Sequence, residues 1–142
     1  MAYTWTDELI TGDEKIDSQH KKLFECVNDF LEACSQGRGK EEVENTATFL
    51  YDYTVSHFKD EEEIQLKYDY PEYRNHKELH DAFKIQAIKL VNDILVNGTT
   101  SLMLSKVNVL IGGWIVKHIK NEDIKMVIYI KNIKNINNKE HE

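Results

Sequence analysis

Apolar residues recur at steps of three and four along four stretches of the chain, a spacing that is typical of amphipathic α-helices. The pattern predicts helices over about residues 18–35, 41–67, 72–96 and 101–119. Residues that favour turns separate them: Gly37-Arg38-Gly39, Asp69-Tyr70-Pro71 and Asn97-Gly98. Because short connections make neighbouring helices antiparallel, we expect an all-α, up-down-up-down four-helix bundle.

Both ends of the chain lie outside this pattern. Residues 1–16 are expected to form an extended arm anchored by apolar side chains, before Asp17 or Ser18 caps the first helix. The C-terminal segment, about 123–142, is rich in Asn and Lys with spaced isoleucines. It predicts a short helix or fraying tail, although residues 127–130 would suit a strand equally well. The whole of 1–142 is expected to be one domain, with the bundle over about 17–122.

The inner faces of the predicted helices carry residues that do not belong in an apolar core. On the second helix His57 and Glu61 occupy the stripe that Leu50 begins. A buried carboxylate is costly unless its charge is compensated, and a metal ion compensates it well. Five of the six histidines fall on such stripes: His20, His57, His76, His80 and His118. The sixth, His141, lies in the tail.

A single histidine on an apolar face is more often a satisfied core residue than a ligand. Five of them with Glu61 and a nearby Asp123 are hard to satisfy by hydrogen bonds alone. Asp123 follows His118 by five residues, so it reaches the same face only if the helix bulges there. Seven such ligands are too many for one ion and suit two transition metals.

Composition and charge narrow the other possibilities. The net charge of −7 and the pI near 5.4 argue against nucleic acid and anionic membranes as partners. The longest apolar stretch, 107–116, is too short to span a bilayer, and the N-terminus shows no secretory pattern, so the cytoplasm is the expected location. Cys26 and Cys34 are about 12 Å apart on one helix, too far for a mutual disulfide. They are expected to be half-buried apolar side chains rather than zinc ligands.

Over about residues 5–126 the sequence resembles the bacterial hemerythrins. The motifs that carry the resemblance are Trp5, Ile16-Asp17-Ser18-Gln19-His20-Lys21-Lys22-Leu23, His57-Phe58-x-x-Glu61-Glu62, Tyr70-Pro71, His76-x-x-x-His80 and Trp114-Ile115-Val116-Lys117-His118-Ile119-x-x-x-Asp123. All seven positions at which that family places metal ligands hold the expected residue type.

The resemblance implies a non-haem centre of two iron ions with an oxo or hydroxo bridge. One iron would be held by His76, His80 and His118, and the other by His20 and His57, while Glu61 and Asp123 would bridge the two. The second iron would keep an open position for O2. Reversible O2 binding for carriage, storage or delivery is therefore the expected function. The alternatives are an O2 or redox sensor that acts through a partner and an enzyme that acts on peroxide or nitric oxide.

The resemblance also points to an O2 pocket formed with Trp114, Ile115 and Gln65. Gln65 stands where that family commonly has Met, and Met126 where it commonly has an aromatic residue. The Gln65 amide either turns to water or caps a neighbouring polar group, or it hydrogen-bonds a bridging carboxylate or a pocket water. The longer tail is a candidate contact surface for a protein partner or for self-association.

Overall fold

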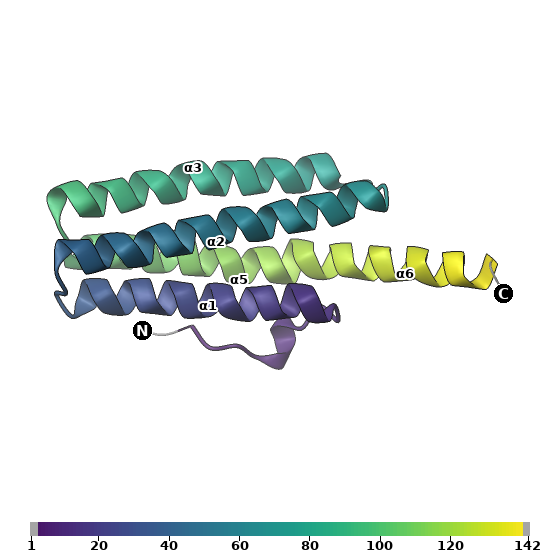
Figure 1. Cartoon of the computed structure of the whole chain (residues 1–142), viewed down its shortest axis with the longest axis horizontal. Helices are drawn as coiled ribbons and strands as arrows, with labels where there is room; N and C mark the ends of the chain where they lie inside the picture. Colours follow the sequence, from purple (N-terminus) through teal and green to yellow (C-terminus); the bar gives the residue numbers. More distant parts are fainter. Residues whose placement is uncertain (1–2, 141–142) are drawn as a thin grey trace.

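The molecule consists of four helical rods packed side by side (Figure 1). The structure is a computed structural model that describes residues 3–140. Three rods are single α-helices, namely α1 (Glu14–Ser35), α2 (Lys40–Lys67) and α3 (Tyr73–Asn97). The fourth is a continuous rod composed of α4 (Ser101–Val107), the π-helical η2 (Asn108–Gly113), α5 (Trp114–His118), the π-helical η3 (Ile119–Asp123) and α6 (Ile124–Glu140). Successive rods run in opposite directions, which confirms the predicted up-down-up-down bundle.

The first helix begins earlier than the sequence pattern indicated. Asp13, and neither Asp17 nor Ser18, is the N-cap, and its side chain accepts a hydrogen bond from the Ile16 N–H at 2.9 Å. The carboxylate of Asp17 instead accepts hydrogen bonds from the backbone and hydroxyl of Thr11, at 2.9 and 2.7 Å. Asp17 therefore ties the N-terminal arm to the helix. The arm itself is not extended throughout, because Asp7–Leu9 forms a 3₁₀ turn, η1.

The C-terminal segment is a long helix, so the expectation of a short or fraying one was wrong. Residues 127–130 lie within α6, and the described residues contain no strand. Met126, Val127 and Ile130 are buried at helical spacing against Ile16 and Tyr70, which stabilises the first two turns of this helix. Beyond this contact α6 projects past the other rods (Figure 1). The tail's suggested role as a contact surface stays a prediction.

Two apolar clusters of unequal size fill the interior. The larger runs from Leu31 and Val43 at one end of the bundle to Phe58, Phe83 and Ile119, and the smaller consists of the residues around Met126. The seven predicted ligands, which come from all four rods, lie along the chain next to members of these two apolar clusters. A polar layer is thus enclosed between apolar ones. Cys26 and Cys34 are free and fully buried rather than half-buried.

By length and composition alone, Ser101–Lys139 could also cross a membrane, with a mean hydropathy of 1.2 in its most apolar window. One such helix is weak evidence, since a core helix of a soluble protein passes the same test. This rod supplies His118 and Asp123 to the interior of the bundle, where both are buried. Packing within the bundle accounts for part of its apolar surface, since 33 % of that window is buried.

Candidate metal centre

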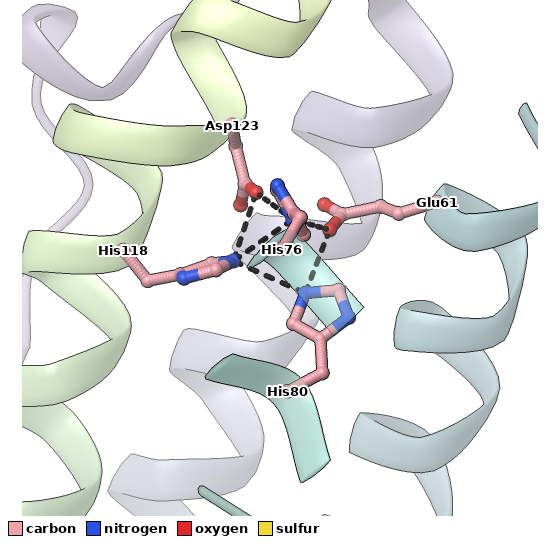
Figure 2. A group of neighbouring side chains, drawn as sticks. All are labelled: Glu61, His76, His80, His118 and Asp123. Carbon is pink, nitrogen blue, oxygen red and sulfur yellow. Dashed lines mark hydrogen bonds and ion pairs between the residues drawn. The ribbon is translucent and has the colours of Figure 1, made fainter. Parts of the chain in front are cut away.

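All seven predicted ligands converge on one point inside the bundle. Each rod contributes at least one, and none of the seven side chains is more than 6 % exposed: His20, His57, Glu61, His76, His80, His118 and Asp123. Figure 2 shows five of them pointing toward one another from α2, α3 and the fourth rod. His141 lies outside the described residues.

Glu61 directs its two carboxylate oxygens toward different pairs of histidines. Its Oε2 lies 2.9 Å from His57 Nε2 and 3.3 Å from His20 Nε2. Its Oε1 lies 3.2 Å from the Nε2 atoms of both His76 and His80. One carboxylate therefore faces two separate groups of imidazole nitrogens.

Asp123 divides its oxygens in the same manner. Its Oδ2 lies 3.0 Å from His20 Nε2, and its Oδ1 lies 3.1 Å from the Nε2 atoms of His76 and His118. Asp123 reaches this position because Ile119–Asp123 is π-helical. In a π-helix the hydrogen bonds run from residue i to i+5, so a residue five positions after His118 returns to its face. The bulge that the sequence required is present.

The seven side chains form two overlapping groups that share both carboxylates. One consists of His76, His80 and His118 with Glu61 and Asp123, and the other of His20 and His57 with the same two acids. Within each group the candidate ligand atoms lie within 4.8 Å of one another. Five imidazole nitrogens and two carboxylates form a donor set that suits first-row transition metals.

Charge compensation in this cluster is visible in the pKa values. Burial alone would lower the pKa of His20, but hydrogen bonds and the charges of Asp123 and Glu61 outweigh it and raise that pKa to about 10. The same partners raise the pKa of His76 to about 9. Burial would raise the pKa values of Glu61 and Asp123, yet the surrounding imidazoles hold both below their ordinary range. The carboxylates therefore require cations, which can be protons on imidazole or bound metal.

Two outer residues orient the imidazoles, and the sequence pattern did not identify either of them. Gln19 Oε1 accepts a hydrogen bond from His57 Nδ1 at 2.6 Å, and Gln19 Nε2 donates to Asp60 at 2.8 Å. Glu62 Oε2 lies 2.9 Å from His80 Nδ1. A proton held on Nδ1 leaves Nε2 free to bind a metal. The sequence signal that could have identified these two residues is that Gln19 adjoins His20 and Glu62 adjoins Glu61.

Aromatic rings cover the side of the cluster that faces the larger apolar core. Phe58 stacks on His80 with centroids 3.7 Å apart, and Trp114 stacks on His118 at 4.4 Å. Ile115 is buried in the same core, 3 % exposed. These contacts fix the planes of two imidazoles and keep water away from them.

The two positions that depart from the resembled pattern touch each other. Gln65 is 0 % exposed, and its amide nitrogen lies 2.8 Å from the sulfur of Met126. Its Oε1 is buried and has no hydrogen-bond partner among the described residues. The alternative in which Gln65 turns to water is therefore wrong. Its amide nitrogen also contacts a thioether rather than a bridging carboxylate.

Comparison with known proteins agrees with this arrangement. The profile of the hemerythrin HHE cation-binding domain matches residues 11–128. A bacteriohemerythrin of Pseudomonas paraeruginosa is 33 % identical over 125 residues, which cover 87 % of this chain and 78 % of that protein. A hemerythrin-like protein of Naegleria gruberi is 30 % identical over 87 % of this chain and 89 % of its own length. A crystal structure of a hemerythrin mutant superposes with a TM-score of 0.79 at 27 % identity, covering 92 % of this chain and 98 % of the other.

Proposed function

The chain belongs to the hemerythrin family, and from this premise we propose that it binds O2 reversibly at a non-haem centre of two iron ions. The observation that carries the proposal is the division of the carboxylate oxygens. Glu61 and Asp123 each turn one oxygen to the group of three histidines and the other to the group of two. Two carboxylates in this arrangement suit a pair of metals better than one.

The seven side chains divide between two metal positions. His76, His80 and His118 would hold one iron, and His20 and His57 the other, with both acids bridging. The second position has one protein ligand fewer, so O2 would bind there. When bound, the two irons would supply the electrons that O2 takes up on binding and would recover them when O2 is released.

The rest of the pocket controls water and orientation. Gln19 and Glu62 hold two imidazoles through their Nδ1 atoms, so that Nε2 faces the interior. Trp114 and Ile115, with Gln65 at the opposite edge, are proposed to line the O2 pocket. Trp114 and the buried Ile115 supply apolar surface that limits the proton supply to bound O2, whereas the buried Gln65 amide is the polar exception.

We extend the proposal to O2 carriage, storage or delivery in the cytoplasm rather than catalysis. The seven buried side chains are all accounted for by holding metal, and the matching family profile is described as a cation-binding domain.

The test combines metal analysis with optical spectroscopy. Protein loaded with iron(II) without air should contain two irons per chain, and its visible spectrum should change on exposure to O2 and return under argon over repeated cycles. The same samples should consume peroxide and nitric oxide much more slowly than they release O2. One metal per chain, or a spectrum that does not reverse, would overturn the proposal.

A further inference from the structure

The N-terminal arm is fastened to α1 by a reciprocal pair of hydrogen bonds. The Tyr3 backbone N–H donates to Asn28 Oδ1 at 2.7 Å, and Asn28 Nδ2 donates back to the Tyr3 carbonyl at 2.9 Å. The Tyr3 ring also contacts Phe24 edge-to-face, with centroids 6.2 Å apart. These contacts hold the Tyr3 side chain in one place against the bundle.

From that position Tyr3 reaches the first π-helical segment. Its hydroxyl donates a hydrogen bond to the carbonyl of Asn108, the first residue of η2. Its ring lies directly over Gly112 in the same segment, where an added Cβ would overlap the ring carbons. Gly112 is thus the residue that lets the ring approach the helix.

The next part of the arm reaches the second π-helical segment. The turn η1 packs against η3, with Leu9 only 2 % exposed. Glu8 forms an ion pair with Lys120, which lies within η3, at 3.0 Å. Between these contacts Trp5 lies beside His20, with ring centroids 6.5 Å apart.

We infer that the arm is a strap that positions His118 and Asp123 by holding both π-helical segments, with Tyr3 as its principal positioning residue. Single-turn π segments are rare because the α-helical hydrogen-bond pattern competes with them. If a segment relaxed to α-helical geometry, every residue after it would rotate by about 100° relative to those before it. Relaxation of η2 would turn His118 away from the cluster, and relaxation of η3 would turn Asp123 away.

The inference rests on the proposed metal centre for its functional meaning but can be tested without metal. Tyr3→Phe keeps the ring and removes the hydroxyl. We expect amide hydrogen exchange over residues 108–123 of the metal-free protein to become about threefold to tenfold faster, the range for one lost hydrogen bond. Loss of iron(II) to excess chelator should accelerate to a similar extent. Tyr51→Phe is the control, since that half-buried tyrosine makes no hydrogen bond among the described residues.

Gly112→Ala gives a second test, because the Tyr3 contact and ordinary helix propensity predict opposite changes in the rate of amide exchange. If Gly112 were only a flexible helix residue, alanine would strengthen the helix and slow exchange. If the Tyr3 contact matters, the new methyl group displaces the ring and exchange over 108–123 becomes faster.

Exchange and iron release equal to the Tyr51→Phe control, or a lower melting temperature without faster local exchange, would overturn the strap. Failure of the wild-type protein to take up two irons would instead count against the proposed function, because the exchange measurement does not depend on it.

Discussion

Replacing Gln65 by methionine should stabilise the metal-free protein. The Gln65 side chain is fully buried, its nitrogen contacts only the weak acceptor of Met126, and its Oε1 has no partner among the described residues. A buried unsatisfied carbonyl costs about 1–3 kcal/mol. Methionine has a similar length and no polar group to satisfy, and it adapts to irregular space. We therefore expect a gain of about 1–2 kcal/mol in the free energy of unfolding, or roughly 3–6 °C in melting temperature.

The same substitution at Gln19 is the matched control, because there both amide groups are used. Gln19 bonds to His57 and to Asp60, so Gln19→Met should destabilise by about 1–3 kcal/mol. Urea unfolding of the two metal-free variants beside the wild type measures both changes. If Gln65→Met destabilises as Gln19→Met does, the Gln65 carbonyl has a partner in solution, such as an ordered water, and the reasoning fails.

The substitution also bears on the O2-bound protein. Gln65 follows Glu61 by one helical turn, and Met126 follows Asp123 by three residues, so the pair lies at the edge of the proposed iron centre. Removing the amide removes a polar group that can guide protons to bound O2. Oxidation of the O2-bound form to the ferric form should therefore slow, with two irons per chain retained. The decay of the O2-dependent absorption in air, compared at one pH, measures this, and an unchanged or faster decay would contradict it.

Two further predictions concern the ligands themselves. In the metal-free protein the pKa values of His20 and His76 are raised to about 10 and about 9. The stability that their protons contribute is fully present below about pH 6.5 and is lost as the pH rises through about 9 to 10. Urea unfolding across this range should show the free energy of unfolding falling with pH, and a flat profile would contradict the prediction. His118→Ala should abolish binding of two irons, whereas Lys117→Ala, on the exposed face, should leave iron content unchanged, and equal iron loss in both would show that this helical register is wrong.

The bundle was predictable because its signals are local and repeated. Inner-face residues recur at helical spacing in all four rods, and Gly98, whose φ is 82°, ends α3 where the Asn-Gly pair indicated. Six of the seven candidate ligands needed no long-range information either, since each occupies a position on a stripe that the apolar residues define, and only Asp123 departs from it. The tail was harder to predict. Its Asn content weakens helix propensity, and only contact with Ile16 and Tyr70, distant in sequence, reveals which of its residues are buried.

The orienting residues escaped prediction for a different reason. Periodicity places a Cβ on a face but says nothing about how far a long side chain reaches. Gln19 and Glu62 lie beside the inner stripes, and their side chains curl inward to the Nδ1 atoms of His57 and His80. Tyr3 is further still from any periodic signal, because it belongs to an arm without regular structure. Contacts made by irregular segments depend on the folded surface they meet.

The spacing between His118 and Asp123 shows how a local irregularity can carry more information than a regular pattern. In an uninterrupted α-helix a residue five positions on is rotated by about 140°, and Asp123 would leave the interior. The chain nevertheless buries this carboxylate, 1 % exposed, among imidazoles from the other rods. A buried acid with matched cationic partners therefore implies a π-helical segment, and the segment is present. Because a widened turn has little intrinsic stability, its persistence depends on contacts from outside the helix, and the N-terminal arm provides them at η3 through Leu9 and Glu8.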